Sequence, residues 1–333
     1  MYGAAAADDD SAADIRKDAP MRFNPKARLD TSRVRDSGRG GGLGGGSAGI
    51  PIPGGTMAGG GIGTLIVIVL IFVLSQCMGG GVGLPTGGGQ AQGGTDTSRM
   101  DDSERYANCK TGADAEGDVD CARIGVENSL YSYWSQETPE LGAEFTPAQM
   151  RTFSGAVSTG CGQASSQVGP FYCPADQTIY LDTTFFDDVL ESQLGGQGGE
   201  FVEPYVIGHE YGHHIQNLLG IMGQVRTQKG PESDAVRLEL QADCFAGVWT
   251  RAATGTADES GVKIFAEVNE QDITEALDSA KAVGDDRIQQ RSGGGVNPEG
   301  WTHGSSEQRM RWFNAGYESG DPSACDTFNA TEL

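Results

Sequence analysis

The stretch His209-Glu210-Tyr211-Gly212-His213 decides how this chain is interpreted. Two histidines stand four residues apart, and at about 100° per residue of a helix their imidazoles lie on one face. Both can then bind one metal ion, with the glutamate beside them. The pattern predicts a zinc-dependent hydrolase in which Glu210 takes the proton of a metal-activated water.

The flanking residues favour a helix over residues 203–219. Apolar side chains recur at helical spacing, Pro204 suits a first turn and Gly220 suits a C-terminal stop. His214 lies about 140° around the helix from His209, so we expect it to pack or hydrogen-bond elsewhere rather than to bind the metal. The alternative is a surface helix that carries histidines by chance, although three of the four histidines of the chain fall within 209–214.

A catalytic zinc ion usually has three protein ligands, so a third donor is expected downstream. Residues 231–251 are predicted to form the next helix, with Ser233 as an early cap. Glu239 and Asp243 share one of its faces. Glu239 is predicted to be the third ligand, and Asp243 could accept the outer N–H of a ligand histidine. The alternative is a solvated acidic edge, because the chain has 46 acidic residues.

Three stretches resemble the bacterial putative neutral zinc metallopeptidase family, a group of membrane-anchored proteins: residues 209–216, 239–243 and 301–309. The likeness covers most of residues 21–319. It implies a zincin-like metallopeptidase domain, with Glu239 as the third zinc ligand and Asp243 as the partner of His209.

His303 lies near the predicted start of a helix over residues 305–318. An imidazole at this place could hydrogen-bond a developing oxyanion, which is the role that similarity to zincins implies. The alternative is a structural histidine.

The N-terminal region has a different composition. Residues 1–56 contain few apolar residues, so disorder is predicted. Residues 57–78 are uncharged, and 62–74 are almost wholly aliphatic. A membrane helix needs about 20 apolar residues, and a single transmembrane anchor over 57–78 is predicted.

The positive-inside rule places residues 1–56, with their arginines, in the cytoplasm and everything after about Gly79 outside. The alternatives are a cleaved signal peptide and a lipoprotein cleavage site at residues 74–77.

A glycine-rich linker is predicted over residues 79–98, an extracytoplasmic domain over 99–326 and a tail over 327–333. Six of the seven cysteines lie in that domain, which favours three disulfides in an oxidising compartment. Close spacing favours two of the pairs, and elimination gives the third: Cys109–Cys121, Cys161–Cys173 and Cys244–Cys325. A zinc site made of cysteines is disfavoured because no Cys-x-x-Cys pair is present, and Cys77 is expected to be inert or lipid-modified.

The predicted fold class is α+β, mainly helical, with a small sheet. The expected helices cover residues 119–136, 187–194, 203–219, 231–251, 270–285 and 305–318, and the expected strands cover 152–157 and 178–181. By resemblance to zincins, the strand over 179–181 could be the sheet edge to which a peptide adds. The alternative is an ordinary core strand.

The net charge of −23 argues against nucleic-acid binding by the whole molecule. The expected partners are a peptide or protein substrate and a lipid bilayer, through residues 57–78. Two other functions remain open: a catalytically silent, zinc-stabilised surface binding module, and a zinc hydrolase of a cell-wall amide. Glu210 argues against the binding module, because a structural zinc site closes all four positions.

Overall fold

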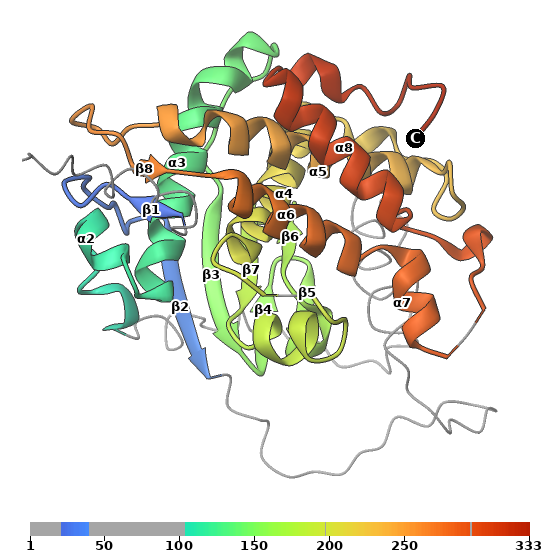
Figure 1. The fold of residues 1–333 in the computed structure, drawn as a ribbon, viewed down its shortest axis with the longest axis horizontal. Helices are drawn as coiled ribbons and strands as arrows, with labels where there is room; N and C mark the ends of the chain where they lie inside the picture. The colour runs from blue at the N-terminus through green and yellow to red at the C-terminus, as the bar shows by residue number, and fades with distance from the viewer. Residues whose placement is uncertain (1–20, 40–103, 197, 294) are drawn as a thin grey trace, which may run out of the picture.

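The computed structural model describes residues 21–39, 104–196, 198–293 and 295–333 (Figure 1). Helices predominate and the sheets are small, as predicted. The helices are α2 Gly112–Ala115, α3 Val119–Glu140, α4 Val202–Leu218, α5 Asp234–Ala252, α6 Glu270–Ala282, α7 Asp285–Arg291 and α8 Ser306–Ser319, with a π-helix, η4, at Phe186–Glu191. The strands are β1 Arg22–Phe23, β2 Val34–Arg39, β3 Gln149–Ser154, β4 Ala156–Thr159, β5 Gly162–Ser165, β6 Phe171–Cys173, β7 Thr178–Asp182 and β8 Phe265–Glu267.

The largest sheet has four strands in the order β2-β3-β7-β6. The first three are parallel, and β6 runs antiparallel to β7, with Tyr172 opposite Ile179. Strand β7 is therefore internal, because β3 and β6 pair with its two sides. The prediction that residues 179–181 form the sheet edge is wrong, and the alternative of a core strand is observed. The strand that ends the sheet on this side is β6.

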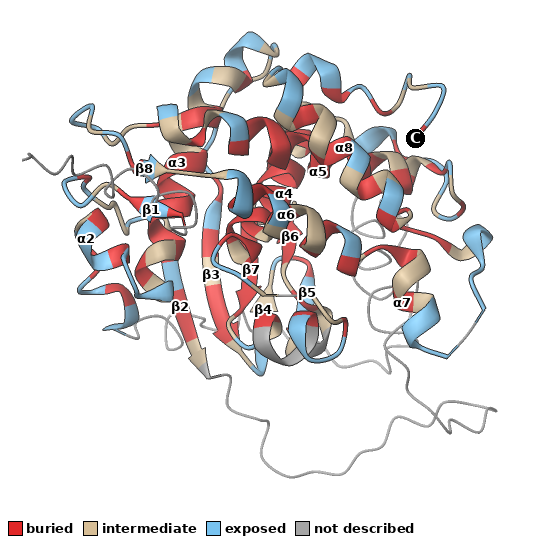
Figure 2. Cartoon of the chain, in the orientation of Figure 1, coloured by how far each residue is buried: buried red, intermediate tan, exposed pale blue. Residues whose placement is uncertain are grey.

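Helix α5 forms the centre of the helical part (Figure 2). Each of its residues from Leu238 to Thr250 is buried, as in a helix that is covered on all sides. Helix α8 packs directly on its backbone: a Cβ on Gly247 would lie 2.1 Å from the carbonyl oxygen of Phe313, and one on Gly316 would lie 2.0 Å from that of Cys244. Only glycine permits this approach.

The three predicted disulfides are confirmed. Cys109 pairs with Cys121, Cys161 with Cys173 and Cys244 with Cys325. The last bond attaches the C-terminal segment to α5. The prediction of a separate tail over 327–333 is wrong, since Thr327 and Leu333 are buried and the guanidinium of Arg237 donates to the carbonyl oxygens of Thr327 and Ala330.

Two predicted elements are divided in the structure. The strand over 152–157 breaks at Gly155, whose φ of 89° separates β3 from β4. The helix over 270–285 ends at Ala282, because Gly284 has an extended backbone and α7 begins after it. The other predicted helices are present, with ends that differ by a few residues.

The prediction of disorder over residues 1–56 is wrong for 21–39. Strand β1 pairs with β8 and β2 pairs with β3, and the segment buries four apolar side chains: Met21, Phe23, Ala27 and Val34. The folded domain therefore includes residues that precede the boundary predicted at 99. The apolar segment over 57–78 lies outside the described residues, and within the described ranges no helix has the length and apolar character to cross a membrane.

Replacement of Phe23 by alanine tests this correction. The Phe23 ring stacks on that of Phe265 at a centroid distance of 4.8 Å, and its side chain is 2% exposed. Phe23→Ala should lower the free energy of unfolding of the full chain by about 3–5 kcal/mol in denaturant titrations. The exposed neighbour Lys26 supplies the control, and Lys26→Ala should change it by about 0.5 kcal/mol or less. Equal stability of the two variants would mean that the segment is not folded on the domain.

Candidate metal centre

Helices α4 and α5 bring the predicted ligands together. His209 and His213 lie on α4, and Glu239 lies on α5. The two helices approach closely at Gly212, where a Cβ would lie 3.0 Å from the carbonyl oxygen of Ala242. This contact places the histidine face of α4 against the carboxylate face of α5.

The ligand atoms of His209, His213 and Glu239 form a compact, buried group. The Nε2 atom of His209 lies 3.2 Å from Oε2 of Glu239, and the Nε2 atom of His213 lies 3.4 Å from Oε1. One ligand atom from each residue lies within 4.8 Å of the other two. Tetrahedral zinc with bonds of about 2.0–2.2 Å separates its ligand atoms by about 3.3–3.6 Å. The three side chains therefore fit a zinc ion.

Asp243 orients His209 for this purpose. Its Oδ1 accepts a hydrogen bond of 2.8 Å from Nδ1 of His209 and one of 2.7 Å from the hydroxyl of Tyr205. The guanidinium of Arg309, on α8, donates to both of its oxygens, at 2.8 Å from Nε and 2.9 Å from Nη2. Because Nδ1 of His209 carries the proton, its Nε2 has a free lone pair for a metal.

Gln216 has the same effect on His213. Its Oε1 lies 2.8 Å from Nδ1 of His213, and its Nε2 donates to the carbonyl oxygen of Leu238 at 2.7 Å and to Oε1 of Gln241 at 3.1 Å. Since the amide nitrogen of Gln216 is engaged with two acceptors, its oxygen faces the histidine and accepts the Nδ1–H. Both ligand histidines therefore direct Nε2 toward Glu239.

The electrostatics of the group favour a cation. Burial lowers the pKa of His209, but the carboxylates of Asp243 and Glu239 outweigh this effect and raise the pKa to about 10. Burial raises the pKa of Glu239, yet the positive charge of His213 and His303 holds it well below its usual range. The group thus stabilises positive charge at its centre, which a divalent cation supplies in place of protons.

Glu210 lies beside the ligands, outside the group that could bind the metal. Its carboxyl is buried, which raises its pKa, while His213 and His209 lower it in part. The backbone N–H of Tyr172, in β6, donates to it. A carboxylate with a raised pKa is better suited to accept a proton near neutral pH than an ordinary surface glutamate is.

His303 is held next to this group by Asp285, the first residue of α7. One oxygen of Asp285 accepts from the backbone N–H groups of Thr302, His303 and Gly304, at 2.7, 2.7 and 3.2 Å. The Nδ1 atom of His303 lies 2.9 Å from the hydroxyl of Thr302 and 3.4 Å from the other oxygen of Asp285. The imidazole is close enough to Glu239 to lower the pKa of that carboxyl.

His214 makes its contacts elsewhere, as expected. Its Nε2 lies 2.7 Å from the carbonyl oxygen of Thr146, and its Nδ1 lies 3.0 Å from the hydroxyl of Tyr172. Burial lowers its pKa to about 4, so it is neutral at pH 7. A neutral ring donates from Nε2 to Thr146 and accepts from Tyr172.

Four polar residues at the site had no role in the sequence prediction: Tyr205, Gln216, Asp285 and Arg309. Gln216 and Arg309 lie within the stretches that carry the family resemblance, which was the available signal. Tyr205 lies four residues before His209, at a spacing that places both on one face of α4. Nothing in the local sequence of Asp285 indicated a contact with His303.

A family model described as "Putative neutral zinc metallopeptidase" matches residues 21–328. Uncharacterized protein Rv2575 of Mycobacterium tuberculosis is 53% identical over 229 residues, which are 68% of this chain and 76% of that protein. Uncharacterized protein YpfJ of Escherichia coli K12 is 45% identical over 201 residues, 59% of this chain and 66% of its own length. No solved structure is significantly similar.

The contact of Gln216 with His213 leads to a test of metal affinity. Gln216→Met keeps a similar volume but removes the acceptor of the Nδ1–H, so zinc affinity should fall by about 10- to 100-fold in competition with a chelating dye. Gln224→Met is the control, because Gln224 is exposed, and its affinity should equal that of the wild type. Unchanged affinity in Gln216→Met would show that this hydrogen bond does not orient a metal ligand.

Proposed function

Because the chain belongs to the putative neutral zinc metallopeptidase family, we propose that it hydrolyses peptide bonds with a zinc ion bound by His209, His213 and Glu239. The observation that carries the proposal is the buried His-His-Glu group, with Glu210 next to it on the same helix. The three ligands leave one tetrahedral position for water or substrate.

When bound, zinc polarises the scissile carbonyl and lowers the pKa of a water molecule. In the proposal, Glu210 accepts a proton from this water while the water oxygen forms a bond to the carbonyl carbon. Glu210 then transfers the proton to the nitrogen of the leaving amine as the C–N bond breaks. The raised pKa of the Glu210 carboxyl supports both transfers, because it brings this pKa closer to the pKa of the attacking water and of the leaving amine.

His303 is proposed to donate a hydrogen bond to the oxyanion that forms on the carbonyl oxygen. The argument is its place beside Glu239 and its attachment to Asp285. Since Asp285 and Thr302 surround Nδ1, the Nε2 atom is the one that remains to face a substrate.

A peptide is the proposed substrate because the family model describes a metallopeptidase. Strand β6 ends the described four-stranded sheet, and its residue Tyr172 contacts both Glu210 and His214. A peptide bound at the proposed base would therefore lie close to β6, whose three residues are buried. The three disulfides support an oxidising compartment outside the cytoplasm as the place of action.

Replacement of the proposed base separates catalysis from metal binding. Glu210→Gln should retain zinc at wild-type stoichiometry and lower kcat for a diverse peptide mixture by at least about 100-fold, because the amide cannot accept the proton. Glu239→Gln is the companion variant and should lose zinc affinity together with activity. Full turnover by zinc-loaded Glu210→Gln would exclude the proposed role of Glu210.

His303→Ala should lower kcat by about 100- to 1000-fold, because the oxyanion would lose a donor. KM, zinc content and the midpoint of thermal unfolding should change little if the side chain acts on the transition state alone. A loss confined to thermal stability, with kcat retained, would identify His303 as a structural residue.

A further inference from the structure

Residues 21–39 and the domain that carries the metal site form one folded unit through main-chain pairing. Strand β2 is parallel to β3 with Val34 opposite Met150 and Arg35 opposite Arg151, and β1 is antiparallel to β8 (Figure 1). Other backbone bonds extend the contact: Asn24 N–H donates to Ile264 O at 2.8 Å, and Gly112 N–H donates to Ala27 O at 2.9 Å. The segment is thus an integral part of the sheets.

A buried ion pair ties the same segment to α3. The Arg33 guanidinium donates to both oxygens of Glu127, at 2.7 and 3.2 Å, and lies 4.0 Å from the centre of the Tyr131 ring. Glu127 is 1% exposed, and burial raises its pKa although Arg33 opposes the rise. Loss of Arg33 would leave a buried carboxylate without its cation, which strongly destabilises a fold.

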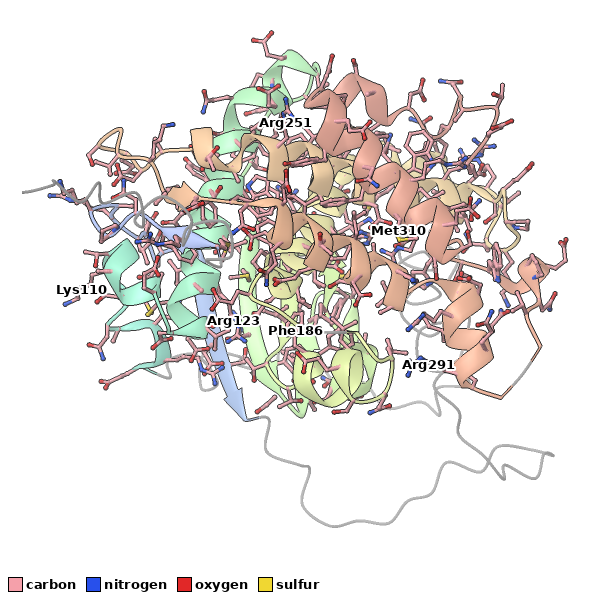
Figure 3. The ribbon with its side chains drawn as sticks, viewed as in Figure 1. Lys110, Arg123, Phe186, Arg251, Arg291 and Met310 are labelled. Atoms are coloured by element: carbon pink, nitrogen blue, oxygen red, sulfur yellow. A yellow bond between two sulfur atoms is a disulfide. The ribbon has the colours of Figure 1, made fainter. Side chains whose placement is uncertain are left out.

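Helix α3 in turn supports the catalytic helix. The guanidinium of Arg123, labelled in Figure 3, pairs with the carboxylate of Glu203 in the first turn of α4. The N-terminal segment therefore contributes to the frame that holds His209 and His213.

The pairing of residues 21–39 with the domain limits how the chain can be placed relative to a membrane. Residues 21–39 precede the apolar stretch at 62–74, whereas the other strands and helices that the structure describes follow it. Paired strands lie about 4.8 Å apart, and the hydrocarbon core of a bilayer is about 30 Å thick. Strands β2 and β3 cannot pair across a membrane.

The arginines of the segment do not argue against this consequence. Arg33 is engaged with Glu127 and Asp30, so its charge contributes to the fold. The positive-inside rule applies to charges in loops next to a membrane span. Some of the arginines that were counted in residues 1–56 belong instead to the folded domain.

We infer that residues 21–39 stand in the same compartment as the metal site, so that the chain before residue 40 and the chain after residue 103 lie on the same side of any membrane. A single crossing of the apolar stretch, with residues 1–56 in the cytoplasm and the metal site outside, conflicts with this arrangement. The inference is independent of the proposed chemistry, because it depends only on strand pairing and burial.

Thiol labelling of the full chain in bacterial cells tests the inference. In a Cys77→Ser background, Arg35→Cys and Lys26→Cys report on the N-terminal segment, and Val119→Cys and Val296→Cys report on the domain. All four positions are exposed, Val119 at 57% and Val296 at 43%. A membrane-impermeant maleimide is applied to intact spheroplasts and to lysed cells, and each signal is normalised to the signal after denaturation.

The expected result is one pattern for all four cysteines: all react in spheroplasts, or all react only after lysis. Two reporters in the N-terminal segment and two in the domain keep the test valid if one variant fails to fold. If both N-terminal cysteines react only after lysis while both domain cysteines react in spheroplasts, the inference is overturned.

Discussion

The buried carboxylate of Asp243 joins three helices at the metal site. Asp243 lies on α5 and accepts hydrogen bonds from His209 and Tyr205 on α4 and from Arg309 on α8. Its side chain is fully buried. A buried charge is stable only when it is paired and hydrogen-bonded, and Arg309 supplies both forms of compensation. The orientation of a ligand histidine is therefore coupled to the packing of the helical core. The close contact of α5 with α8 at Gly247 and Gly316 makes this coupling rigid.

The juxtaposition of the candidate metal ligands was predictable from sequence because these residues lie on periodic elements. The spacing of His209 and His213 specified the shared face, and Glu239 and Asp243 repeat that spacing on the next helix. Arg309 and Asp285 contact the site although they lie far along the chain from His209 and His213. Their contacts depend on how α7 and α8 pack, which local periodicity does not contain.

The N-terminal segment shows a different limit of prediction. Averaged over residues 1–56, apolar content is low, and the average hides isolated anchors such as Phe23 and Val34. Each anchor fills a site made by residues far along the chain, as Phe23 does against Phe265. Short strands of this kind gain their stability from non-local pairing, so their own composition carries little signal. The position of β7 inside the sheet was ambiguous for the same reason, since β6 has only three residues.

Anomalous X-ray diffraction at the zinc edge, from crystals of the zinc-loaded full chain, would locate the ion among the candidate ligands. One strong peak is expected about 2.0–2.2 Å from Nε2 of His209, Nε2 of His213 and a carboxylate oxygen of Glu239, with a water in the fourth position next to Glu210. A peak elsewhere, or a fourth protein ligand that closes the site, would contradict this expectation and favour a structural zinc ion.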